Sequence, residues 1–167
     1  MSLREILQWP DSRLQAVCTP VGDITPEIES LAADMLETMY AAPGRGLAAP
    51  QVGVLRRLFV MDVAWKEGAR YPQVFVDPQI VGESRAAVSG DEACLSIPGV
   101  TACVVRPEWV EVKWRDLEGR PHHRRLEGIE ARCAQHELDH LNGVVTLDRL
   151  DAGARAAAMA DYPQAAP

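Results

Sequence analysis

Apolar and polar positions follow two different periods along this chain. Between residues 28 and 39 the apolar side chains recur every three or four positions, which predicts a helix with one buried face. This stripe consists of Ile28, Leu31, Met35 and Met39. Thr25-Pro26 is a start signal, a hydroxyl N-cap followed by proline in the first turn, and Pro43-Gly44 is a stop signal. We therefore expect a helix from Pro26 to the Pro43-Gly44 pair.

A two-residue alternation appears in the second half of the chain. Over residues 108–115 three apolar side chains alternate with charged ones, which predicts a half-buried antiparallel strand. These apolar positions are Val110, Val112 and Trp114. The other expected elements are a loop over residues 44–53, strands near 57–63, 73–81 and 100–105, and a helix over about 129–141 that Asn142-Gly143 ends.

The order of these elements indicates the fold class. Strands and two helices without a regular strand–helix alternation are typical of an α+β fold. A chain of 167 residues is long enough for one compact domain, so we expect a single domain over residues 1–167. After Leu150 the alanine-rich sequence predicts a short helical tail, about residues 151–167, that frays toward Pro167.

Charge and composition exclude several classes of protein. The net charge of −7 argues against a nucleic-acid partner, because phosphate binding needs clustered Lys and Arg. The one small basic cluster, residues 120–125, is interpreted as an exposed turn and strand. The apolar stretch at the N-terminus is interrupted by charges, and no apolar run could cross a bilayer. We therefore expect a cytoplasmic protein without a membrane partner. The irregular spacing of four cysteines does not indicate a disulfide framework.

The candidate chemistry begins at His136-Glu-Leu-Asp-His140. Residues four apart lie on the same face of a helix, so His136 and His140 can present two imidazole nitrogens to one divalent metal. Glu137 lies beside them as a candidate general base. The run predicts a metal site, although a single HExxH pattern also occurs by chance.

A catalytic metal site needs a third protein ligand. Metalloproteases with a long HExxHxxGxxH motif have it downstream, but the matching position here is Thr146, which is a poor zinc ligand. Cys94, in a polar segment that enters a strand, is a better candidate. Cys133 lies a full turn back from His136, and we expect it to pack in the core. Cys18 and Cys103 lie in apolar surroundings, and we expect them only to pack.

Three segments, in this order, resemble the three signature motifs of the peptide deformylases. They are a GxGxAAxQ loop at Gly44–Gln51, an EGCLS-type segment at Glu92–Ser96 and an HExDH segment at His136–His140. The resemblance covers essentially the whole chain. It implies antiparallel sheets packed around a central helix that carries the HExxH motif. It also implies a metallohydrolase that removes the formyl group from the N-terminal methionine of nascent polypeptides.

The resemblance also implies a role for each matching residue. The metal ligands would be Cys94, His136 and His140, binding one divalent ion, Fe²⁺ or Zn²⁺. Glu137 would be the acid and base, and Gln51 with the backbone N–H of Leu95 would bind the formyl oxygen. Gly46 would let the peptide backbone approach the loop closely. The partners would be an N-formylated peptide and, transiently, the ribosome.

Three positions depart from the family pattern. Ala93 stands where the family usually has glycine, and this costs about 1 kcal/mol if the backbone there has positive φ. Arg45 and Arg132 stand at positions near which, by the resemblance, a typical deformylase lines its methionine pocket with apolar side chains. Two guanidinium groups are costly to bury unpaired. Either they reach solvent, or they favour a substrate with a carboxylate and disfavour formyl-methionine.

Alternative functions therefore stay open at this point. One is an amidohydrolase of the same fold that acts on another N-formylated or N-acylated substrate. Another is a catalytically silent module that binds formyl-peptides. Among the remaining polar residues, we expect Glu92 to pair with an arginine such as Arg106, and Asp139 to support the metal ligands indirectly. His122 and His123 are expected to be exposed on a strand.

Overall fold

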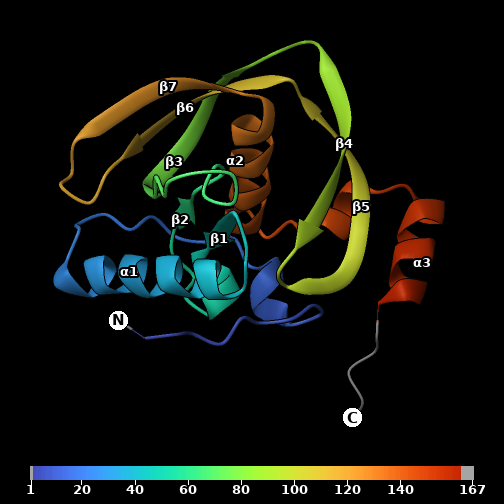
Figure 1. Cartoon of the computed structure of the whole chain (residues 1–167), viewed down its shortest axis with the longest axis horizontal. Coiled ribbons are helices and arrows are strands. Elements are labelled where there is room, and N and C mark those ends of the chain that lie inside the picture. Colours follow the sequence, from blue (N-terminus) through green and yellow to red (C-terminus); the bar gives the residue numbers. More distant parts are fainter. Residues whose placement is uncertain (1, 163–167) are drawn as a thin grey trace.

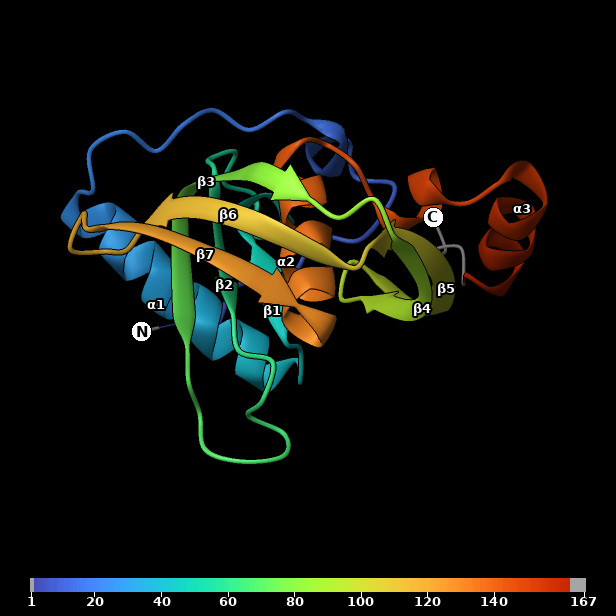
Figure 2. The ribbon, with the colours of Figure 1, turned by 90° about the horizontal axis from the view of Figure 1, so that it is seen from above.

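Two antiparallel sheets flank one central helix in the computed structural model, which describes residues 2–162. A five-stranded sheet has the order β1-β2-β3-β6-β7, and β4 and β5 form a separate hairpin. The strands are β1 (Gly46–Ala48), β2 (Leu58–Met61), β3 (Gln73–Glu83), β4 (Ala87–Cys94), β5 (Ile97–Pro107), β6 (Trp109–Arg115) and β7 (Pro121–Glu127). Helix α2 (Gly128–Leu141) lies between the sheet and the hairpin in both views (Figures 1 and 2). The predicted α+β class is confirmed.

Helix α1 (Pro26–Ala41) covers β1 and β2 with the stripe that the sequence predicts. Leu31, Met35 and Met39 are buried there in one apolar cluster. Proline stands in the first turn as expected, and Thr25 is the N-cap residue. The expected hydroxyl cap is wrong, however, because the Thr25 side chain makes no capping hydrogen bond to the backbone.

Helix α2 is buried on nearly all sides, although only one side of it is apolar. Eight consecutive residues, Ala134–Leu141, are buried. Ala131, Ala134, Leu138 and Leu141 pack against aromatic and β-branched side chains of the five-stranded sheet. The polar side faces the β4–β5 hairpin. Since buried polar groups are costly unless they are paired, this second side is where function is expected.

The hairpin is the main element that the hydrophobic pattern did not predict. The strand expected at 100–105 is the middle of β5, but its partner β4 was not expected as a strand. Gly90, Asp91 and Glu92 interrupt the apolar alternation of β4. Strand β1 also forms within the segment expected to be a loop, through pairing with β2. The strands expected at 57–63, 73–81 and 108–115 correspond to β2, β3 and β6.

Trp9, near the start of the described chain, and Tyr162, after the last helix, meet on the hairpin side of the molecule. Helix α3 (Ala152–Asp161) confirms the short alanine-rich helix and packs on β5, and the expected fraying toward Pro167 lies outside the described residues. The hydroxyl of Tyr162 donates to the carbonyl of Trp9 at 2.8 Å. Short 3-10 helices η1 (Ser12–Gln15), η2 (Ala49–Val52) and η3 (Thr146–Arg149) complete the fold.

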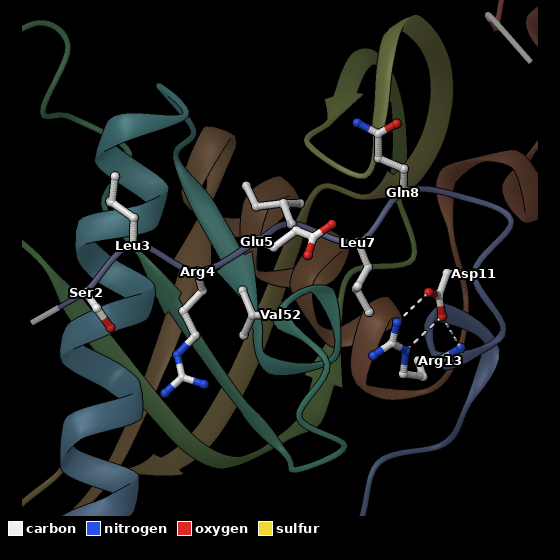
Figure 3. A pocket seen from close by; sticks show the side chains of 10 residues that line it. Ser2, Leu3, Arg4, Glu5, Leu7, Gln8, Asp11, Arg13 and Val52 are labelled. Atoms are coloured by element: carbon white, nitrogen blue, oxygen red, sulfur yellow. Dashed lines mark hydrogen bonds and ion pairs between the residues drawn. The ribbon is translucent and has the colours of Figure 1, made fainter. Parts of the chain in front are cut away.

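The N-terminal segment, residues 2–9, runs across the molecule next to two of the sequence motifs. The N–H of Leu7 donates to the carbonyl of Gln51, and the N–H of Trp9 donates to the carbonyl of Ser96, each at 2.8 Å. A cavity of about 890 Å³ follows this segment, and Asp11 and Arg13, which pair with each other, are among the residues that line it (Figure 3). None of the candidate metal ligands lines this cavity. No helix among residues 2–162 is long and apolar enough to span a membrane.

Candidate metal centre

Cys94, His136 and His140 come together at the centre of the fold. Their donor atoms lie within 4.8 Å of one another, and all three residues are buried. The Sγ of Cys94 is 3.4 Å from the Nε2 of His140. Cys94 ends strand β4, whereas the two histidines lie one turn apart on the polar side of α2. The hairpin and the central helix thus each supply part of one cluster.

A carboxylate fixes the orientation of His136. Its Nδ1 lies 2.9 Å from Oε1 of Glu92, which leaves Nε2 turned toward Cys94. Arg106 donates two hydrogen bonds to the same carboxylate, at 2.6 and 2.8 Å, so the expected Glu92–Arg106 pair is confirmed. Burial alone would raise the pKa of Glu92, but Arg106 and His136 hold this pKa at about 2. An anionic carboxylate behind an imidazole is the usual support for a metal-bound histidine.

The chemistry of the three donors fits a divalent metal ion. Burial, together with the positive charge of Arg106, lowers the pKa of His140 and keeps its ring in the neutral form that binds metals. Its Nδ1 is buried without a hydrogen-bond partner among the described residues, so the ring presents Nε2 to the cluster. Two imidazoles and one thiolate suit Zn²⁺ or Fe²⁺ and leave a fourth coordination position open.

Glu137 lies next to the donors but is not one of them. Burial raises its pKa to about 7, and its Oε2 has no hydrogen-bond partner within residues 2–162. Gly46 makes this position possible. A Cβ on Gly46 would lie 2.8 Å from Cδ of Glu137 and 2.9 Å from Sγ of Cys133. A carboxyl group with a pKa near neutrality can both accept and return a proton.

The amide of Gln51 is held in place from both ends. Its Oε1 accepts from the N–H of Ala48 at 2.9 Å, and its Nε2 donates to the hydroxyl of Ser96 at 3.0 Å. The same Nε2 lies 3.7 Å from the Sγ of Cys94. Leu95 and Ser96 form the turn between paired residues Cys94 and Ile97, so the N–H of Leu95 takes no part in strand pairing. Sequence reasoning missed Ser96, although it is the last residue of the second motif.

One cavity of about 460 Å³, between the glycine loop, the β4–β5 turn and α2, is lined by Gln51, Cys94, Leu95, His136 and Glu137. The cavity walls also include Arg45, Ala93, Cys133 and Arg132. Cys133 packs against the core as expected but also reaches this wall. Cys18 is buried as expected, whereas Cys103 is exposed, so the expectation that Cys103 packs is wrong.

The structure accommodates all three departures from the family pattern. Ala93 lies in extended backbone in β4, so it does not carry the strain that a positive φ would cause. Arg45 forms an ion pair with Glu67, on a loop that also supplies Trp65 Nε1–H to the carbonyl of Gly44 at 2.8 Å.

Arg132 is likewise paired, with Glu92 at 2.7 Å. Each guanidinium group thus has a carboxylate partner, Glu67 for Arg45 and Glu92 for Arg132, and the Arg45 side chain also remains about one-third exposed. Asp139 receives a hydrogen bond from Arg106 at 3.0 Å and so supports Glu92 indirectly. The side chains of His122 and His123 are about half exposed on β7, as expected.

A buried Cys/His/His donor set with a free carboxylate beside it, in this α+β fold, defines a metal-dependent hydrolase. The family model described as Polypeptide deformylase matches residues 3–156. The chain belongs to the polypeptide deformylase family.

Individual relatives agree with this assignment over nearly their whole length. The peptide deformylase of Afipia carboxidovorans is 49% identical over 166 residues, covering 99% of this chain and 97% of that relative. A crystal structure of a peptide deformylase from Legionella pneumophila matches with a TM-score of 0.90 and 41% identity, covering 96% of this chain and 93% of the other. The Ehrlichia chaffeensis peptide deformylase in complex with actinonin matches with a TM-score of 0.90 and 39% identity, covering 96% and 95%.

Proposed function

We propose that this protein removes the formyl group from the N-terminal methionine of nascent polypeptides and releases formate. One observation carries the proposal: Cys94, His136, Glu137 and Gln51 all line the same cavity, and His140 completes the donor set behind it. The relative from Ehrlichia chaffeensis, whose structure holds actinonin, has the same fold at a TM-score of 0.90. The activity of the family and the geometry of this site thus support the same reaction.

The metal would be held by Cys94, His136 and His140, and either Fe²⁺ or Zn²⁺ suits these donors. When bound, such an ion supplies Lewis acidity and lowers the pKa of a water molecule toward neutrality. Glu137 accepts the proton of the attacking water and returns it to the departing amine. Its free Oε2 and its raised pKa suit both steps.

Gln51 and Leu95 would stabilise the negative charge that develops on the formyl oxygen. The amide Nε2 of Gln51 is directed toward Cys94 and Ser96, and the N–H of Leu95 is not used by the hairpin. Hydrogen-bond donors that are already in position before the reaction stabilise a developing oxyanion most strongly. Loss of one such donor typically lowers the rate about 100-fold. Ser96 is a positioning residue, because it orients the Gln51 amide.

A formate-release assay tests the proposal. Protein purified without oxygen should release formate from formyl-Met-Ala-Ser, and Glu137→Gln should lose most turnover while it keeps its metal and fold. Glu130→Gln is the matched control, since Glu130 lies on the same helix but pairs with Arg124 away from the cavity. Full activity of Glu137→Gln would refute the acid–base role. Formate release only from other formyl or acyl substrates would favour the alternative substrate class, and no turnover would favour a silent binding module.

Two further points belong to the same proposal. The polypeptide substrate emerges from the ribosome, so a transient association there follows from the activity. We also propose that residues 1–167 form one domain, a view supported by the family match over residues 3–156 and by α3 packing on β5.

A further inference from the structure

The cavity at the metal centre extends along α2, toward the start of that helix. His136 and Cys133 line it near the donors, and Arg132 and Ile129 line it farther along. A second cavity of about 650 Å³ lies beyond, between the start of β4, Trp109 and the start of α2. Three residues line both cavities, namely Asp91, Ile129 and Arg132. Arg132 thus stands where the two cavities adjoin.

Arg132 is fixed at this boundary by three acceptors. Its Nη1 donates to Oε2 of Glu92 at 2.7 Å and to the carbonyl of Val104 at 2.9 Å, and its Nη2 donates to the carbonyl of Val88 at 2.8 Å. Only 18% of the side chain is exposed. The guanidinium therefore joins α2 to both strands of the hairpin, and its rigid fork makes this arrangement hard for another side chain to reproduce.

Gly90 provides the space for this side chain. A Cβ on Gly90 would lie 2.9 Å from both Cζ and Nε of Arg132. The guanidinium thus packs directly against the backbone of β4. This pair of residues, one small and one large, fills the boundary between the two cavities.

We propose that Arg132 closes the inner end of the active-site cavity and so limits the length of side chain accepted on the formylated residue. The inference rests on the proposed function, because a formyl group at the metal directs the adjacent side chain into this cavity. The Nη1 and Nη2 groups of Arg132 already have acceptors, and Glu92 balances its charge. Arg132 therefore limits the cavity sterically and does not bind a carboxylate of the substrate.

The test is a series of formyl-Xaa-Ala-Ser peptides with unbranched side chains of increasing length. The series is norvaline, norleucine, 2-aminooctanoate and 2-aminodecanoate, each compared with methionine as a ratio of kcat/KM. In the wild type the ratio should fall by about 10-fold or more between norleucine and 2-aminooctanoate, since a closed pocket rejects added methylenes. In Arg132→Ala the second cavity becomes accessible, and the fall should shrink to within about 3-fold.

Arg125→Ala is the matched control. Arg125 lines the second cavity and lies over the ring of Trp109, 4.0 Å from its centroid, but it does not line the active-site cavity. This variant should keep the wild-type length profile. The same shift in Arg125→Ala as in Arg132→Ala would overturn the proposal.

Two further measurements test the proposal even if Arg132→Ala does not fold. Arg132→Lys keeps a charge beside Glu92 but loses the fork, so it should shift the profile in the same direction by a smaller factor. The wild-type profile needs no variant, and a flat wild-type profile up to 2-aminodecanoate would overturn the proposal. An unchanged length profile in an active Arg132→Ala enzyme overturns this inference alone. If the wild-type enzyme releases no formate from any peptide, the proposed function itself is refuted.

Discussion

Gly46, in the glycine loop, lies directly against the carboxylate of Glu137 from the HExxH motif. A side chain at position 46 would need the space that this carboxylate occupies. The sequence resemblance gives Gly46 the role of admitting the peptide backbone. The structure adds a second reason for glycine here, because Glu137 and Cys133 fill the position of a Cβ. The glycine loop therefore sets the position of Glu137, the carboxylate for which we propose the proton transfer.

Gly46→Ala should lower kcat by about 100-fold, because displacement of a reacting group by about 1 Å has this effect. Gly68→Ala is the control, since the nearest atom to its added Cβ is 3.9 Å away and Gly68 has no positive φ. Both variants are measured by formate release and thermal unfolding. Wild-type activity in Gly46→Ala would show that Glu137 can adjust without loss.

Metal content distinguishes the two cysteines near the centre. Cys94→Ser should lower metal affinity by more than about 100-fold, because a thiolate ligand is replaced by a poor one. Cys133→Ser should keep about one equivalent, since Cys133 is not among the clustered donors. Elemental analysis after dialysis measures both. A Cys94→Ser protein with a full equivalent of metal would contradict the ligand assignment.

Residue chemistry was predictable from the sequence where a motif carries it. The metal donors and the Glu92–Arg106 pair are examples, since both follow from residue type and from the need to pair a buried charge. The surroundings of Arg132 were not predictable. Two of its acceptors are backbone carbonyls on strands 28 and 44 residues away in sequence, and no spacing rule relates them to the helix.

At the scale of elements, the two sides of α2 show why the hydrophobic pattern predicted only some of the helices and strands. The helix was predictable from the four-residue spacing of its histidines and from its stop signal. Strand β4 was not, because it faces the polar side of α2. An apolar alternation forms only where the opposite layer is apolar, so a strand beside a catalytic centre lacks the usual signal.

Helix α3 should stabilise the hairpin through one residue. Ala158 is buried against β5, whereas its neighbour Ala157 is exposed. Ala158→Asp should lower the free energy of unfolding by about 2 kcal/mol, because it buries an unpaired carboxylate. Ala157→Asp adds the same charge to the same helix and should change this free energy by less than about 0.5 kcal/mol. Urea titration measures both, and equal effects would mean that α3 does not dock on β5.

At the scale of the whole molecule, the N-terminal segment joins elements that are far apart in sequence. Its backbone bonds to Gln51 and Ser96, and its first described residue bonds to α1, where the N–H of Ser2 donates to Asp34 at 2.8 Å. This attachment was not predictable from the sequence, since residues 2–9 show neither period and their hydrogen bonds to Gln51 and Ser96 join backbone atoms. The segment lies behind both groups that would bind the formyl oxygen.

Acid should loosen this attachment. The N–H of Ser2, aided by Arg4, lowers the pKa of Asp34 in the folded protein. A folded pKa below the unfolded value means that the carboxylate stabilises the fold above about pH 4 and that this contribution is lost as the pH falls further. Asp34→Asn should therefore be less stable than the wild type at pH 7, and the gap should narrow below about pH 4. Denaturant midpoints measure the gap, and a constant gap would contradict the linkage.

The contacts of Trp9 have a consequence for the time at which the active site is completed during translation. Trp9 is synthesised early, yet its N–H binds Ser96 and its carbonyl accepts from Tyr162, 153 residues later. Contacts this distant in sequence form late, after the intervening chain has been made. A protein that acts on growing chains would thus remain inactive until its own chain has been made as far as Tyr162.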